Sequence, residues 1–91
     1  MATRTGILQV EVVTRTERLW HGRATSVVVP AIEGDLGVLT GRAPLLAVLR
    51  PGSVAIETEL EGRKIIKVSG GFASVDSDFV TIVVEEGNFA Q

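Results

Sequence analysis

Apolar and polar residues alternate along several short stretches of the chain. In residues 8–13 every second residue is apolar, namely Leu8, Val10 and Val12, and residues 53–60 alternate in the same way. A repeat of two places successive side chains on opposite faces, so it is typical of a strand with one buried face. In the second stretch, the side expected to face inward comprises Val54, Ile56, Thr58 and Leu60.

The choice of aliphatic residues also favours strands. Fourteen valines and six isoleucines stand against eight leucines. Side chains branched at Cβ lose rotamer freedom on a helix but pack well on a pleated sheet. Residues 79–84 (FVTIVV) are apolar on nearly both faces, and we predict a further strand there.

Turn-forming residues separate these stretches at short intervals. Gly62 lies between two alternating segments and predicts a hairpin, in which glycine supplies the positive φ of the turn. Residues 76–78 (DSD) predict a polar turn, and Gly22 and the pair Pro51-Gly52 predict two more. Residues 43–49 are compatible with one helical turn or with a strand. We count eight or nine short strands and no long helix, which predicts an all-β fold, an antiparallel sandwich or barrel.

Length and charge narrow the possible functions. Ninety-one residues predict one domain over 1–91, with a core at about 7–86 and a short tail at 87–91. The net charge of −2 leaves no basic excess for binding nucleic acid. No cysteine is present, which excludes disulfides and thiolate zinc sites. We expect no secretory signal, because the first residues lack a basic segment leading into a long apolar run. We expect no direct membrane insertion, because no apolar run approaches the roughly 18–20 residues of a spanning helix.

The segment GDLGVLTGRAP, residues 34–44, is rich in glycine and resembles a phosphate-binding loop at first sight. Its spacing excludes that interpretation. Gly37 and Gly41 are separated by three residues instead of four, and Arg42-Ala43 stands where a phosphate loop has lysine and serine or threonine. The dinucleotide fingerprint fails as well, because no helix is predicted to follow.

We expect this segment to be a stiff loop whose glycines adopt left-handed or crowded geometry. Its role is either structural or partner binding, since loops held on a rigid sheet are common binding sites. The expected loop-shaping residues are Gly34, Gly37 and Gly41, the side chains expected to turn inward are Leu36, Val38 and Leu39, and those expected to face outward are Asp35 and Arg42.

No set of residues predicts catalysis, a cofactor or a metal site. His21, the single histidine, has no predicted nucleophile or orienting partner, so we interpret it as a surface turn residue. Residues 76–78 lack the glycine and the terminal glutamate of a calcium loop. The four aromatic residues are dispersed, and we expect core or rim packing from Trp20, Phe72, Phe79 and Phe89.

Several motifs together give the chain a specific resemblance. From about residue 8 to residue 86 it resembles the epsilon subunit of bacterial and chloroplast F-type ATP synthases. The family's loop reads glycine, acid, apolar, glycine, two apolar residues, proline, glycine, histidine, any residue and proline. Residues 34–44 follow that pattern except at Thr40, where proline is usual, and Arg42, where histidine is usual. The other matching motifs are residues 8–13, Trp20-His21-Gly22 at a hairpin, Leu45-Leu46, Arg50-Pro51-Gly52 and Gly70-Gly71-Phe72.

The resemblance implies a β-sandwich of about ten short strands and a non-catalytic role. Such a subunit joins the gamma subunit to the ring of c subunits in a proton-translocating ATP synthase, as part of the rotor. It implies a c-ring contact at Gly34 and Asp35, and a gamma contact at Arg42, Ala43 and Pro44. It also implies a peripheral location at the cytoplasmic face of a bacterial cell membrane, rather than at a chloroplast thylakoid.

Family members usually add a C-terminal helical hairpin, and no helical pattern follows Glu86. We therefore expect neither ATP binding nor helix-mediated inhibition of ATP hydrolysis from this chain. Two alternatives to the rotor subunit are open at this point. One is a free-standing β-sandwich module that binds a peptide or a carbohydrate, and the other is a small hydrolase that uses His21.

Overall fold

The computed structural model describes residues 6–90, and these residues form nine strands and no helix. The all-β prediction is therefore confirmed. Residues 43–49, which allowed two interpretations, contain a strand. The strands are β1 (Leu8–Val13), β2 (Arg18–Ala31), β3 (Gly34–Val38), β4 (Leu45–Leu49), β5 (Gly52–Thr58), β6 (Arg63–Val68), β7 (Gly71–Asp76), β8 (Phe79–Val84) and β9 (Gly87–Phe89). The predicted domain 1–91 also includes residues 1–5 and 91, which lie outside the described residues.

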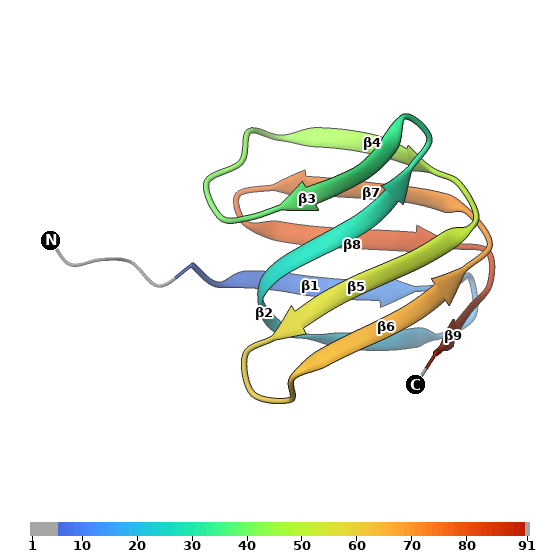
Figure 1. Cartoon of the computed structure of the whole chain (residues 1–91), viewed down its shortest axis with the longest axis horizontal. Helices are drawn as coiled ribbons and strands as arrows, with labels where there is room; N and C mark the ends of the chain where they lie inside the picture. The colour runs from blue at the N-terminus through green and yellow to red at the C-terminus, as the bar shows by residue number, and fades with distance from the viewer. Residues whose placement is uncertain (1–5, 91) are drawn as a thin grey trace, which may run out of the picture.

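Two layers of strands face each other across the core (Figure 1). One layer contains β1, β8, β7 and β4 in that order. Strand β2 connects it to the other layer, which contains β5, β6 and β9, and β3 pairs with β2. Strand β2 also pairs with β1, so β1, β8, β7, β4 and β2 form a closed circuit of five strands. The fold is thus the expected sandwich, held together by one long strand that both layers share.

The predicted antiparallel sandwich contains one parallel pair of strands. Strand β1 runs parallel to β8, with Val10 opposite Val80 and Val12 opposite Ile82. The other four neighbouring pairs of the circuit are antiparallel. Because alternating directions cannot close a circuit with an odd number of strands, one parallel pair is required.

The core consists of the inward-facing aliphatic residues of both layers. Leu8, Val10 and Val12 are buried as the alternation predicted, and no polar or charged residue among those described is buried. Each fully buried aliphatic side chain stabilises the fold by about 1.5–3 kcal/mol. Leu60 is the exception to the predicted alternation, because β5 ends at Thr58 and Leu60 lies 89% exposed in the turn that follows.

The segment Trp20-His21-Gly22 does not form a turn, contrary to the sequence prediction. All three residues lie within β2, and the β1–β2 turn falls earlier, where Thr14 Oγ1 accepts hydrogen bonds from the amides of Thr16 and Glu17, both at 3.2 Å. Gly22 serves to leave room for an aromatic ring. A Cβ at Gly22 would lie 2.9 Å from Cζ2 of Trp20.

The last strand extends the sheet beyond the expected core. Residues Gly87–Phe89, which we expected in a C-terminal tail, form β9 and pair with β6, with Phe89 opposite Ile66. The amide of Ala90 also donates a hydrogen bond to the carbonyl of Ile65 at 2.8 Å. Three residues are too short for the alternation signal, which explains why the sequence did not reveal them.

The predicted turn at residues 76–78 is confirmed and has a second role. Ser77 and Asp78 adopt φ of 53° and 67°, the left-handed conformations of a tight hairpin between β7 and β8. The Asp78 carboxylate accepts a hydrogen bond from the amide of Gly41 at 2.9 Å. This bond ties the β3–β4 connection to the β7–β8 turn, two segments that are far apart in the sequence.

The Gly71 position allows no other residue. Its φ is 139°, and a Cβ there would overlap the carbonyl oxygen of Val83 and lie 2.8 Å from Cα of Val84. Close backbone contact with β8 therefore requires glycine. Gly37 differs, because it is not among the glycines with positive φ and a Cβ there would meet nothing within 4 Å.

Substitution of Gly71 by alanine is expected to destabilise the fold by about 2–4 kcal/mol, through backbone overlap and strain. Gly37→Ala is the matched control and is expected to change stability by less than about 1 kcal/mol. Urea unfolding followed by circular dichroism gives both values. Equal stability of the two variants would contradict the close approach of β7 and β8.

Asp78→Ala is expected to cost about 1–2 kcal/mol, because the turn loses a residue that tolerates positive φ and the Gly41 amide loses its acceptor. Asp78→Asn keeps both properties in large part, since asparagine also tolerates positive φ and offers a carbonyl oxygen. Thermal unfolding of the two variants should separate them, and equal losses would contradict this role of the side chain.

Candidate partner-binding surfaces

The predicted loop at residues 34–44 is part strand and part connection. Gly34 to Val38 form β3, which pairs with β2, and Asp35 lies opposite Pro30. Leu36 is half-buried and Val38 is buried, as expected, whereas Leu39 is exposed. The inward prediction for Leu39 was wrong because β3 ends one residue earlier and the chain then leaves the sheet.

Two of the three glycines in this segment shape the backbone as predicted. Gly34 has a φ of 133° at the start of β3, and Gly41 has a φ of 83° in the connection to β4. The expected left-handed or crowded geometry is wrong for Gly37, which lies in regular strand with free space around it. The bend at Gly34 directs the chain from the β2–β3 turn into β3.

Asp35 faces solvent and is paired with a cation. Its side chain is 67% exposed, and its Oδ1 lies 2.8 Å from Nη2 of Arg50. Pro30 lies next to both residues. It is the register partner of Asp35, and its carbonyl accepts a hydrogen bond from the Arg50 amide at 2.9 Å. Gly52 leaves room for this arrangement, since a Cβ there would lie 2.9 Å from Cβ of Pro30 and 3.3 Å from Nη1 of Arg50.

The residues Arg42, Ala43 and Pro44 are exposed in the connection between β3 and β4. They follow the end of β3, whereas Asp35 lies at its beginning. A strand of this length spans about 15 Å. The structure therefore keeps the two predicted contact groups, Gly34-Asp35 and Arg42–Pro44, at opposite ends of β3.

An exposed apolar surface, which the sequence analysis did not identify, continues from Arg42–Pro44 along β4. Leu46 is 69% exposed, Val48 is 56% exposed and Phe72 on β7 is 43% exposed. Val48 and Phe72 are register partners, so their side chains lie on the same outer face. We call Leu46, Val48 and Phe72 the β4–β7 surface. An exposed apolar patch of this kind is a candidate interaction site.

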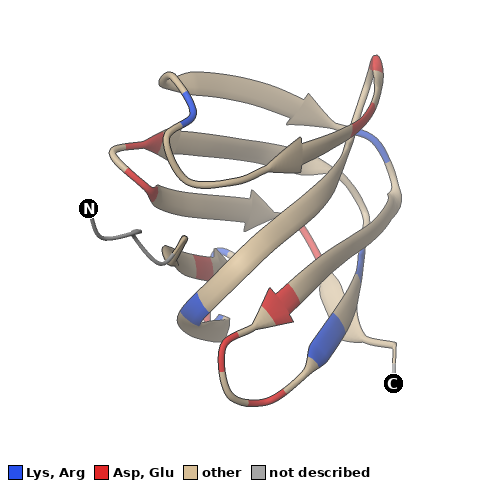
Figure 2. Ribbon diagram, turned by 60° about the vertical axis from the view of Figure 1, so that its left-hand side comes forward, with Lys and Arg blue, Asp and Glu red and all other residues tan. Residues whose placement is uncertain are grey.

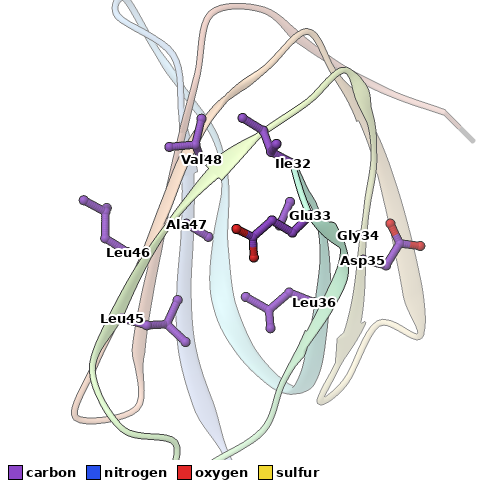
Figure 3. Close-up of a pocket in the computed structure, with 10 residues that line it drawn as sticks. Ile32, Glu33, Gly34, Asp35, Leu36, Leu45, Leu46, Ala47 and Val48 are labelled. Atoms are coloured by element: carbon purple, nitrogen blue, oxygen red, sulfur yellow. The ribbon is translucent and has the colours of Figure 1, made fainter.

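A cleft of about 570 Å³ opens between β3 and β4, which we call the β3–β4 cleft. Its walls include Leu36 from β3 and Leu45 and Ala47 from β4, all half-buried. The carboxylate of Glu33, from the β2–β3 turn, points into the cleft, whereas the side chain of Asp35 points away from it (Figure 3). Sequence reasoning gave Glu33 no role, because a single acid in a turn carries no pattern.

Charged residues are distributed in pairs and not in a basic patch. Figure 2 shows Lys and Arg interspersed with Asp and Glu over the described strands and turns. All five ion pairs found there have partners that are exposed or half-buried and none that is buried, so each contributes at most about 1 kcal/mol. The pairs are Glu11–Arg18, Arg23–Glu59, Asp35–Arg50, Glu57–Arg63 and Glu61–Lys64.

Within the described residues the single histidine belongs to no metal-binding cluster. His21 is an exposed strand residue opposite Glu11, not the turn residue that the sequence predicted. Within residues 6–90, no three His, Cys, Asp or Glu side chains are placed to hold a metal ion. That part of the chain also contains no helix with the length and apolarity needed to cross a membrane.

Known proteins similar in sequence to this chain include ATP synthase epsilon chains from bacteria. The chain is 51% identical over 69 residues to the ATP synthase epsilon chain 2 of Ralstonia nicotianae, which covers 76% of this chain and 50% of the relative. It is 41% identical over 83 residues to the ATP synthase epsilon chain of Streptomyces griseus, covering 91% of this chain and 67% of the relative. The chain thus spans about half to two thirds of the length of these curated relatives.

Solved structures share the same fold. A chain in the cryo-EM structure of the Euglena gracilis mitochondrial ATP synthase (OSCP/F1/c-ring, rotational state 1) superposes with a TM-score of 0.85 and 23% identity, covering 98% of this chain and 56% of the other. A chain in the central stalk/c-ring structure of the Tetrahymena thermophila mitochondrial ATP synthase gives a TM-score of 0.73 and 18% identity, with coverages of 89% and 65%.

The family comparison covers nearly every described residue. Residues 7–90 match the family described as ATP synthase, Delta/Epsilon chain, beta-sandwich domain. The closed five-strand circuit and the glycine-shaped β2–β3–β4 region are thus features of a chain that belongs to the delta/epsilon family of ATP synthase subunits.

Proposed function

We propose that this chain is a non-catalytic subunit of the central stalk of a proton-translocating F-type ATP synthase. In this role it attaches the gamma subunit to the ring of c subunits, so that rotation of the ring is transmitted to the catalytic head. It works at the cytoplasmic face of a bacterial cell membrane and reaches the membrane only through its partners. Its relatives named ATP synthase epsilon chain support the proposal.

The observation that carries the proposal is the exposure of the two predicted contact groups, Gly34-Asp35 and Arg42–Pro44, at opposite ends of β3 on one rigid body. Gly34 and Asp35 project at the β2–β3 turn and form the ring-contact group. Residues Arg42, Ala43 and Pro44 continue into the β4–β7 surface and form the gamma-contact group. A subunit that joins two partners needs two such surfaces, with an apolar centre in at least one of them for lasting attachment.

The interior of the sandwich suits a mechanical role. Both layers share β2, and the core is made of closely packed aliphatic side chains with no buried polar residue among those described. Close-packed interiors have low compressibility, so force applied at one surface is passed to the other with little deformation. Transmission of torque requires this stiffness and no catalytic group.

The alternative of a peptide- or carbohydrate-binding module has less support. Such a module needs aromatic side chains gathered on one face, whereas the four aromatic residues lie on β2, β7, β8 and β9. The relatives of the present chain named above are ATP synthase epsilon chains and not modules of this kind. A hydrolase based on His21 also has less support, because the carboxylate of the neighbouring Glu11 is paired with Arg18 at 3.0 Å and no hydrogen bond joins His21 to a nucleophile within residues 6–90.

The gamma contact is tested by Val48→Asp. A charge at the centre of the β4–β7 surface is expected to weaken binding to gamma by roughly 30-fold, because the interface would have to bury an unpaired carboxylate. Leu60→Asp is the matched control, since Leu60 is even more exposed but lies on the β5–β6 turn. Isothermal titration with purified gamma measures both. Equal binding by the two variants would place the gamma contact elsewhere.

The ring contact is tested by charge reversal of Asp35. Asp35→Lys places a second cation beside Arg50 and is expected to weaken attachment to a gamma–c-ring complex by roughly tenfold. Binding to gamma alone should not change, because Asp35 lies at the other end of β3. Surface plasmon resonance on immobilised c-ring complexes gives the affinity, and an unchanged value would remove Asp35 from the ring contact.

A further inference from the structure

We propose that two copies of this chain pair through the open edge of β3, in an antiparallel register centred on Leu36. The partner is a second copy of the chain, so the inference goes beyond the proposed function and does not depend on it. The pairing joins the β2–β3 hairpins of the two copies into one continuous sheet. It concerns the unassembled chain, because the proposed function assigns Asp35 to the ring.

One edge of β3 has no partner strand within residues 6–90. There β3 pairs only with β2, and β4 contacts β2 on the opposite edge of that strand. Strand β3 is also exposed at Gly34, Asp35 and Gly37. An unpaired edge offers free amides and carbonyls to a further strand, and proteins usually protect it with charges or proline. Strand β3 contains no lysine or proline, and its single charge, at Asp35, is offset by Arg50 at 2.8 Å.

The backbone groups of Asp35 and Gly37 point to this open edge. Asp35 lies opposite Pro30, which has no amide hydrogen and whose carbonyl accepts a hydrogen bond from the amide of Arg50 at 2.9 Å. Pro30 and Asp35 are therefore a pair without hydrogen bonds, and Asp35 turns its amide and carbonyl away from β2. Because this direction alternates along a strand, Gly37 does the same. Outside the β2–β3 ladder, no backbone hydrogen bond among residues 6–90 involves Asp35 or Gly37.

A second copy in this register satisfies every free group of the edge. When Leu36 lies opposite Leu36 of the second copy, Asp35 of each copy lies opposite Gly37 of the other. Each of these two pairs exchanges two hydrogen bonds, in which the amide of one residue donates to the carbonyl of the other. The contact has a two-fold axis at Leu36. Such a contact is closed, because each copy uses its β3 edge once, so the pairing ends at a dimer.

The side chains of β3 suit this arrangement on both faces. Leu36 is half-buried and points into the β3–β4 cleft, whereas Asp35 points away from it (Figure 3). Side chains approach most closely in a pair without hydrogen bonds, so the two Leu36 side chains cover part of each other's exposed surface. On the outer face each Asp35 lies opposite a glycine, and its carboxylate keeps Arg50 as partner.

The pairing also gives Gly37 a role that it lacks in the single chain. Gly37 is not among the glycines with positive φ, and a Cβ there would meet nothing within 4 Å. Glycine inside a strand is less stable than alanine, and it often marks a place where another backbone approaches closely. The β3 edge of a second copy is such a backbone.

The test is sedimentation equilibrium of the full chain from about 10 μM to about 1 mM, where we expect a monomer–dimer equilibrium. Gly37→Pro removes the amide hydrogen at the open edge, a position where a strand tolerates proline. This change is expected to weaken dimerisation by roughly tenfold, because two hydrogen bonds are lost by symmetry. Gly37→Ala is the matched control, since it keeps the amide and should dimerise like the unmodified chain.

Amide hydrogen exchange of the unmodified chain gives a second measurement that needs no variant. The amides of Asp35 and Gly37 should exchange freely in dilute solution and become protected as the concentration rises. A monomer at every concentration overturns the inference. Equal dimerisation by Gly37→Pro and the unmodified chain, or exchange at Asp35 and Gly37 that does not change with concentration, also overturns it. The rotor function would stand in each case, because it is tested separately with gamma and the c-ring. Melting curves confirm that both variants are folded.

Discussion

The shared strand β2 is the constraint on which the rest of this structure depends. Its fourteen residues pair with β1 and β3 along one edge and with β5 and β4 along the other. Because β2 belongs to both layers, the circuit of five strands is closed. Closure of an odd number of strands requires one parallel pair, which is β1–β8. Strand β2 also fixes where β3 lies, because β3 pairs with the last residues of β2 on the edge opposite to β4 and has no ladder with β4 among the described residues.

The proposed contact surfaces follow from this arrangement. The β2–β3 turn projects Gly34 and Asp35, the departure of β3 opens the cleft that Glu33 faces, and β4 carries Leu46 and Val48 outward beside β7. Each surface is defined by backbone geometry before any side chain is considered. Side chains then give these surfaces different chemistry, with an ion pair at Asp35, a carboxylate at Glu33 and an apolar centre at Val48.

The sequence predicted most of the fold because alternation, β-branched residues and turn glycines are local signals. It failed where a tertiary contact decides the conformation. Gly22 looks like a turn residue but leaves room for the ring of Trp20, and Gly41 and Asp78 are joined by a hydrogen bond across 37 positions. Strand β4 is apolar on both faces, so the pattern could not show that Leu46 and Val48 face outward. Glu33 has no pattern at all, and only the spatial neighbourhood of β3 and β4 shows that it faces a cleft.

The central claim is that one domain holds gamma and the c-ring at the same time through different surfaces. Native mass spectrometry of the chain mixed with purified gamma and c-ring tests it most directly. We expect a complex that contains one chain, one gamma and one ring, with gamma increasing the retention of the chain on the ring. Mutually exclusive binding, in which added gamma releases the chain from the ring, would contradict the account.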